Sequence, residues 1–141
     1  MKFWDTSALA PLLIRESSTE AVLRIIEEDP EIAVWWGTET ECLSALARRE
    51  REKQLSRQDV TNAERDLGHL MQGALEIIPG PDVRRHARRL LMTHPLRAAD
   101  AFQLAAAMVL AGDQTSQVAI VTFDQNLATS AQREGFLTLP E

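Results

Sequence analysis

Apolar and polar positions alternate along this chain with two different periods, which predicts strands interleaved with helices. We expect a strand at each of five short β-prone runs: residues 2–4, 32–36, 75–79, 119–123 and 136–139. Between these runs apolar residues recur at helical spacing. That spacing predicts helices after Asp5, after Ser17 and after Gly37, and over residues 56–74, 82–92, 98–111 and 124–134.

Local signals predict where some of these helices begin. Ser17 and Glu20 have the spacing of a capping box, in which each side chain bonds the backbone of the other. Gly37 ends the second strand, and Thr38 then opens a helix whose apolar positions are Leu43, Leu46 and Ala47. Strands that alternate with helices in this way are typical of a three-layer α/β fold around a mainly parallel sheet.

The chain reads as one domain over residues 1–141, without a linker, repeat or low-complexity segment. Hydrophobic residues make up 45% and charged residues 26%, as in ordinary globular proteins. The single cysteine, Cys42, permits no internal disulfide and no cysteine-based metal site, which favours a reducing compartment. No run is long enough to cross a membrane and no export signal is present, so we expect a cytoplasmic protein.

The net charge of −6 argues against a broad basic surface that binds nucleic acid through counterion release. A polynucleotide enzyme of this charge needs locally concentrated positive charge, or metal ions that mask the acids facing its substrate.

Two aspartates stand where a predicted strand passes into a helix. Asp5 follows the first strand and Asp124 follows the fourth, so parallel strands place both at one edge of the sheet, where α/β proteins bind ligands. Each has an alternative structural role, because aspartate is a favoured helix N-cap.

Two further acids lie early in helices. Glu41 comes three residues after Thr38, so its carboxylate could simply close a capping box. Asp100 and Gln103 are the polar residues of an otherwise apolar helix that we expect to be buried on most sides. A buried carboxylate needs a partner, and Arg97, three residues before Asp100, could form a plain ion pair with it.

Together the four carboxylates point to a metal centre. Acids gathered at one sheet edge repel one another unless a divalent cation neutralises them. Oxygen ligands indicate Mg²⁺ or Mn²⁺, and the lack of cysteine and histidine clusters counts against zinc. Such a site can activate water for an in-line displacement at phosphorus, which predicts phosphodiester hydrolysis.

Four segments give the chain a family resemblance: DTSAL at 5–9, TETECLSALARR at 38–49, LRAADAFQLAAA at 96–107 and VTFDQNLATSA at 121–131. In this order and at these separations they resemble PIN-domain ribonucleases, most closely the VapC-type toxins of toxin-antitoxin pairs. The resemblance extends from residue 1 to about residue 139.

The resemblance implies a sheet ordered 3-2-1-4-5, a magnesium or manganese site and an RNA substrate. Asp5 and Asp100 would be the main metal ligands, Glu41 would ligate the metal or hold a water, and Asp124 would complete the site. Ser7 and Thr122 fall where the family has small hydroxyl residues, which could orient a carboxylate or water; ordinary helix-start capping is the alternative for Ser7. The family also implies a small antitoxin protein as partner and a homodimer.

The tryptophans at 35 and 36 depart from the family pattern, which usually has smaller and often polar residues before the second acid.

Arginine-rich runs at 48–57 and 84–89 could hold RNA phosphates, but a solvated helix face balanced by Glu50 and Glu52 is the simpler reading. Arg97 is the better candidate for a functional arginine because its position ties it to Asp100. The three histidines show no ligand spacing, and Cys42 is interpreted as a packing residue.

Two other function classes compete with the ribonuclease. A non-catalytic binding or regulatory module of the same fold would account for the acidic charge and the tryptophans. A phosphorylated Asp5, as in receiver-like or phosphatase-like domains, ranks last because such sites want a second acid beside the nucleophile and a late lysine, whereas the only lysines are Lys2 and Lys53.

Overall fold

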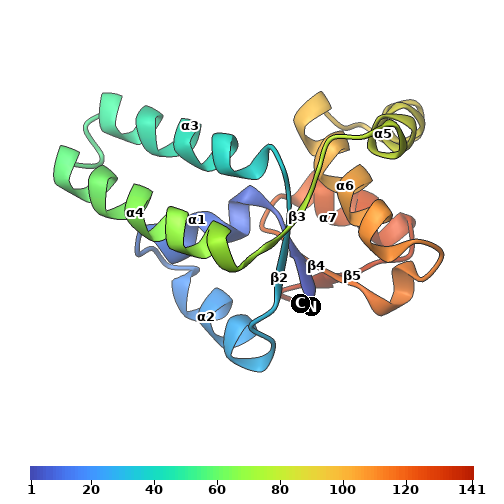
Figure 1. Cartoon of the computed structure of the whole chain (residues 1–141), viewed down its shortest axis with the longest axis horizontal. Helices are drawn as coiled ribbons and strands as arrows, with labels where there is room; N and C mark the ends of the chain where they lie inside the picture. The colour runs from blue at the N-terminus through green and yellow to red at the C-terminus, as the bar shows by residue number, and fades with distance from the viewer.

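The central sheet consists of five parallel strands in the order β3-β2-β1-β4-β5, in a computed structural model that describes all residues 1–141 (Figure 1). The predicted order is confirmed. The strands are β1 (Lys2–Trp4), β2 (Ile32–Trp35), β3 (Leu75–Ile77), β4 (Ala119–Val121) and β5 (Leu137–Leu139). The central strand β1 pairs with β2 on one side and with β4 on the other.

Seven α-helices form the outer layers. They are α1 (Thr6–Leu13), α2 (Thr19–Glu28), α3 (Thr38–Arg51), α4 (Arg57–Gly73), α5 (Pro81–Thr93), α6 (Ala98–Ala111) and α7 (Gln125–Arg133). A short 3-10 turn, Thr115–Gln117, precedes β4. Helices α1 to α4 lie on one side of the sheet and α5 to α7 on the other, so the predicted three-layer architecture is confirmed (Figure 1).

The strands build two cores because successive side chains point to opposite faces. Phe3 packs with α5, α6 and α7, whereas its neighbour Trp4 packs with α1, α2, α3 and α4. Ala33 and Val34 divide in the same way, as do Ile120 and Val121. The strands are therefore apolar on both faces, which is why they read as continuous apolar runs in the sequence.

Some predicted boundaries were too wide. The third strand ends at Ile77, whose carbonyl accepts a bond from the Trp36 N–H, and the following Pro79 has no N–H to continue the ladder. The fourth strand ends at Val121, although the Thr122 N–H still donates to the Leu139 carbonyl at 2.9 Å; the Thr122 hydroxyl enters a side-chain network described below.

One local prediction was wrong. The cap of α2 is Ser18, without a side-chain bond, so the predicted capping box of Ser17 and Glu20 does not form. Thr19 organises this turn instead: its hydroxyl accepts from the Glu16 N–H and donates to the Pro11 carbonyl. In α3 the buried residues are Thr38, Cys42 and Leu46, while Leu43 and Ala47 are exposed, because burial follows an i, i+4 row.

Helix α6 is buried over most of its length, as predicted, with an unbroken buried run from Gln103 to Ala107. It packs along α5 and beneath the sheet face that carries Phe3. None of the helices combines the length and apolar character that a membrane crossing needs.

Candidate active site

Four acidic residues stand at the beginnings of four helices. Asp5 and Asp124 are the N-caps of α1 and α7, and Glu41 and Asp100 lie in the first turns of α3 and α6. The backbone N–H of Asp5 bonds the Val121 carbonyl, which brings the ends of β1 and β4 together. The N-terminal ends of helices favour negative charge, so the fold supplies a suitable place for several carboxylates.

Asp5 is the buried member of the group, with 6% of its surface exposed. Its Oδ2 atom accepts all the hydrogen bonds that the carboxylate receives: from Ser7 Oγ at 2.6 Å, Thr122 Oγ1 at 2.9 Å and the Ser7 backbone N–H at 3.2 Å. Oδ1 accepts none from the protein. One oxygen thus fixes the orientation of the group, and the other is available to a ligand.

The hydroxyl groups around Asp5 have a defined direction. Each hydroxyl has one proton, and those of Ser7 and Thr122 are both donated to Asp5. Their oxygens then accept in turn, Ser7 Oγ from the Phe123 N–H at 2.9 Å and Thr122 Oγ1 from the Asp124 N–H at 3.0 Å. The turn after β4 therefore holds the Asp5 carboxylate through two hydroxyl bridges.

Glu41 does not close a capping box with Thr38, so that structural reading was wrong. Gly37 is the cap of α3, and the Glu41 carboxylate reaches across to other elements. Its Oε2 accepts from Thr6 Oγ1 at 2.9 Å, and both oxygens lie 3.3–3.4 Å from Gln103 Nε2. Glu41 is thereby tied to α1 and α6.

Gln103 is the residue of this region that sequence reasoning missed. It is 1% exposed, and its amide also donates to Thr38 Oγ1 at 3.0 Å. It therefore joins α6 to the start of α3. The signal was present: Gln103 interrupts an apolar helix three residues after Asp100, which places both on one face.

Asp100 and Asp124 complete the group from the other side. Asp100 is half-buried and feels the charges of Asp124 and Asp5, while Asp124 Oδ1 accepts from the Leu127 N–H at 2.9 Å. Both aspartates that follow strands thus also act as N-caps. The ion pair considered for Arg97 and Asp100 does not form; Arg97 is exposed and is the cap residue of α6.

Burial and mutual repulsion disfavour ionisation of three of these acids. Burial raises the pKa of Asp5, against the opposing effect of the hydrogen bonds from Ser7 and Thr122. Burial also raises the pKa of Glu41, with further contributions from the charges of Asp5 and Asp100. The pKa of Asp100 is raised by burial and then by the charges of Asp124 and Asp5. The acids form one electrostatic unit.

The donor set fits a hard divalent cation. It consists of carboxylate oxygens, none of the four acids takes part in an ion pair, and Oδ1 of Asp5 is not engaged by the protein. No three acidic, histidine or cysteine side chains are arranged to hold a metal ion by themselves. Mg²⁺ usually keeps several waters and needs only one or two direct carboxylates. The arrangement therefore suits a partly hydrated Mg²⁺ ion better than a metal ion enclosed entirely by protein ligands.

The cysteine, a buried histidine and the paired arginines have contacts that indicate structural roles. Burial raises the pKa of the Cys42 thiol to about 12, which agrees with a packing role and not with a nucleophile. His94 is buried, with Nε2 2.6 Å from Glu134 Oε1. In the two basic runs, Arg57 pairs with Glu50 and Arg85 with Asp82, as expected for solvated helix faces.

A family model described as PIN domain matches residues 2–132. The chain belongs to the PIN domain family. Two curated relatives, Ribonuclease VapC45 and Ribonuclease VapC49 of Mycobacterium tuberculosis, are each 29% identical over 147 residues, covering 98% of this PIN domain and 94% of the relative. The predicted similarity to PIN-domain and VapC proteins is confirmed.

Solved structures share the fold at low sequence identity. VapC20 of Mycobacterium tuberculosis, described as a sarcin-ricin loop cleaving toxin, superposes with a TM-score of 0.69 at 18% identity, covering 97% of each chain. A toxin-antitoxin complex from Klebsiella pneumoniae gives 0.64 at 17% identity, covering 91% of each chain. At these identities the likeness supports the PIN fold of this chain.

Proposed function

We propose that this chain is a metal-dependent endoribonuclease that acts as the toxin of a toxin-antitoxin pair in the cytoplasm. The observation that carries the proposal is the group formed by Asp5, Glu41, Asp100 and Asp124, four carboxylates at one end of a PIN fold, none of which forms an ion pair. The names of the two curated relatives, both ribonucleases, support RNA as the substrate.

Asp5, Asp100 and Asp124 would hold Mg²⁺ or Mn²⁺, one or two of them directly and the rest through bound water, with Glu41 as a further ligand or the holder of a water. The cation supplies charge that neutralises the scissile phosphate and activates water for attack at phosphorus. Ser7 and Thr122 keep Asp5 oriented, and their donated hydrogen bonds favour its charged form. Glu41, whose pKa is raised, is suited to accept a proton from the attacking water at a carboxylate oxygen.

Arg97 would bind the RNA backbone. It is exposed, forms no ion pair and stands at the start of the helix that carries Asp100. A guanidinium in this place can contact a phosphate directly beside the acids. An antitoxin that covers or disorders this end of the molecule would block both the acids and Arg97. We expect the active form to be a homodimer.

The test is cleavage of a mixed cellular RNA pool by purified protein in Mg²⁺, Mn²⁺ or EDTA, beside Asp5→Asn and Asp100→Asn variants. The proposal predicts discrete products that need the metal and disappear in both variants. If RNA stays intact with every metal, and wild type and Asp5→Asn inhibit growth equally, the proposed ribonuclease activity is ruled out. Tight binding of a partner protein that Asp100→Asn leaves unchanged would then favour a non-catalytic PIN-like module.

A further inference from the structure

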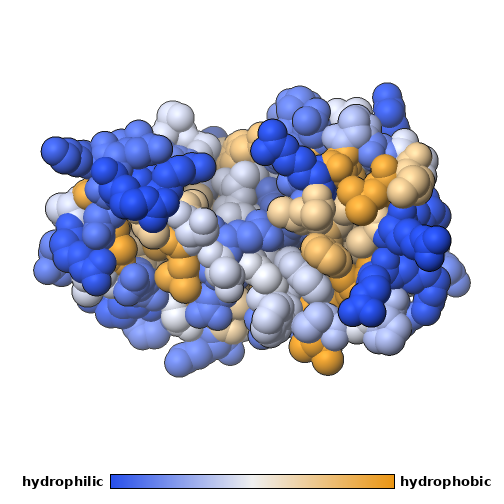
Figure 2. All heavy atoms as spheres, turned by 90° about the horizontal axis from the view of Figure 1, so that it is seen from above, coloured by the Kyte–Doolittle hydropathy of each residue, from blue (hydrophilic) through white to orange (hydrophobic).

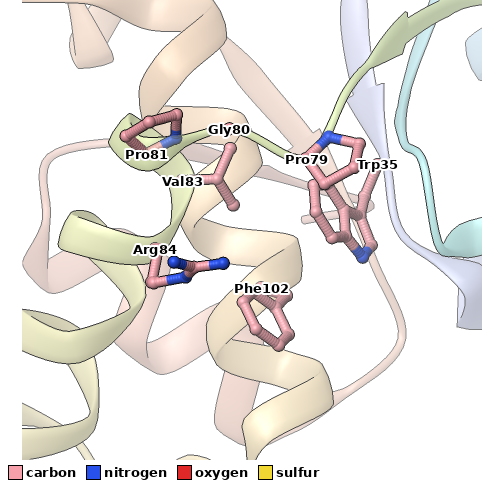
Figure 3. Close-up of a pocket in the computed structure, with 7 residues that line it drawn as sticks. All are labelled: Trp35, Pro79, Gly80, Pro81, Val83, Arg84 and Phe102. Carbon is pink, nitrogen blue, oxygen red and sulfur yellow. The ribbon is translucent and has the colours of Figure 1, made fainter.

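A pocket lies beside the acidic group, between the end of β2, the turn before α5 and the start of α6 (Figure 3). Its volume is about 260 Å³. The lining side chains come from three separate elements, and they are Trp35, Pro79, Pro81, Val83, Arg84 and Phe102. Two prolines make one rim stiff because each fixes its own backbone φ angle.

The pocket has a stacked aromatic wall. The rings of Trp35 and Phe102 lie 5.5 Å apart between centroids and 13° from parallel. Trp35 is 7% exposed and Phe102 is 37% exposed, so the buried indole lies behind a phenyl ring that is partly open to solvent. Gly37 makes room for the indole, because a Cβ there would lie 2.6 Å from Trp35 Nε1.

The single charged side chain of the pocket is Arg84. It is exposed and forms no ion pair, whereas Arg85 and Arg89 on the same helix are paired with Asp82 and Glu134. Figure 3 shows its guanidinium extending toward Phe102. An exposed aromatic ring beside an unpaired guanidinium matches a ligand with a flat ring and a nearby negative charge, which describes a nucleotide.

We infer that this pocket binds an unpaired base of the RNA, stacked on Phe102, with Arg84 on the adjoining phosphate; this rests on the proposed function. Phe102 comes two residues after Asp100, roughly 3 Å farther along the axis of α6 and on a different face. Asp100 and Phe102 thus share the start of α6, and the inference assigns the base in the pocket to a nucleotide that flanks the one at the acids. The pocket selects which bond in a single strand reaches them.

The distribution of aromatic residues favours a nucleic-acid ligand over a protein. Four of the seven aromatic side chains are buried, and the three exposed ones are Trp36, Phe102 and Phe123. Trp36 follows β2, Phe123 precedes Asp124 and Phe102 follows Asp100. Figure 2 looks onto this end of the molecule, where apolar surface gathers on the α5–α6 side. Rings separated in this way suit successive bases of a strand, whereas the apolar surface on the α5–α6 side is a separate feature that the self-association outcome below tests.

Binding without cleavage tests the inference. The probe is a labelled single-stranded RNA of mixed sequence, measured by fluorescence anisotropy in EDTA, together with a counterpart that lacks bases. Phe102→Leu should weaken binding of the intact RNA roughly ten-fold, the scale of one stacked base, and leave the abasic strand unaffected. Phe102→Tyr should bind as wild type. Arg84→Gln should weaken both strands and lower the salt dependence.

Arg88→Gln is the matched control, because Arg88 is exposed and unpaired on the same helix but does not line the pocket. It should bind the intact RNA more tightly than Arg84→Gln does. The inference is overturned if Phe102→Leu binds as wild type or loses both strands equally, or if the variants change only self-association in sedimentation. Because the assay contains no metal, a protein that binds through Phe102 but never cuts RNA would refute the proposed function alone.

Discussion

The carboxylate of Glu134 and the group of carboxylates at the helix starts have opposite surroundings. Glu134, at the end of α7, receives Arg89 Nη2 at 2.8 Å and His94 Nε2 at 2.6 Å, and these partners lower its pKa. The acids at the starts of α1, α3 and α6 receive only hydroxyl, amide and backbone donors, and their pKa values are raised. Glu134 is balanced within the fold, whereas the other group is balanced only when something positive binds.

The two kinds of carboxylate affect the stability of the folded protein in opposite ways. A structural carboxylate is paired with cations of its own chain, so ionisation and folding favour each other. A carboxylate that binds a ligand is repelled by the neighbouring acids until the ligand is bound. This repulsion lowers the stability of the unliganded protein, as is common at functional sites. Four predictions sharpen this contrast, from the largest expected effect to the smallest.

The largest difference should appear in catalysis. Asp5→Asn and Glu134→Gln each remove one carboxylate charge. We expect Asp5→Asn to lower the rate of RNA cleavage by roughly 100-fold or more, the scale for losing one preorganised charged group, while Glu134→Gln leaves the rate per folded molecule unchanged. Initial rates on a single purified RNA, corrected for the folded fraction by circular dichroism, measure both. Similar losses of cleavage rate in both variants would contradict the separate roles given to Asp5 and Glu134.

The hydroxyl bridge to Asp5 should matter almost as much. Thr122→Val keeps the shape of the side chain but removes the donor 2.9 Å from Asp5 Oδ2. Loss of such an orienting partner typically lowers activity or metal affinity roughly 10-fold to 100-fold. Thr122→Ser retains the hydroxyl and should restore most of the rate. Mn²⁺ titration followed by calorimetry gives a readout apart from activity, and unchanged affinity in the valine variant would rule out an orienting role.

Removal of the structural acid should cost stability. We expect Glu134→Gln to lower the free energy of unfolding by about 2 kcal/mol, typical of a hydrogen bond to a charged group. Because the folded pKa of Glu134 lies below its ordinary value of 4.5, its contribution is present above that pH and is lost as pH falls through the lowered value. Urea unfolding at several pH values checks this, and a difference that grows on acidification would contradict it.

Removal of a site acid should have the opposite sign. Asp100→Asn should raise the free energy of unfolding of the metal-free protein by about 0.5–1 kcal/mol at neutral pH, a modest gain because solvent screens a half-exposed charge. The folded pKa of Asp100 is above its ordinary 3.8, so its stabilising contribution is complete below that pH and is lost as pH rises through the folded value. The gain in the variant should therefore shrink on acidification. Added Mg²⁺ should stabilise the wild type and reverse the order.

The repeating pattern of the chain was enough to predict most of the fold. Each strand and helix appears in the expected order, because apolar periodicity depends on local geometry that any α/β protein shares. The failures were local: the capping box at Ser17 and the capping role considered for Glu41. In both places a side chain instead bonds another part of the chain, Thr19 to the Pro11 carbonyl and Glu41 to the Thr6 hydroxyl.

The sequence by itself determined that acids would follow the strand ends, since a strand, an acid and a helix are contiguous at Asp5 and Asp124. Only the tertiary structure decided which partners the acids of the site have. Thr122 reaches Asp5 across 117 positions, and Gln103 reaches Glu41 across 62. The Trp35–Phe102 stack, and Arg97 without an ion pair, likewise depend on strand order and on how α6 crosses the sheet. Periodicity records which face a residue occupies, but the contact between two distant faces exists only after the sheet has brought them together.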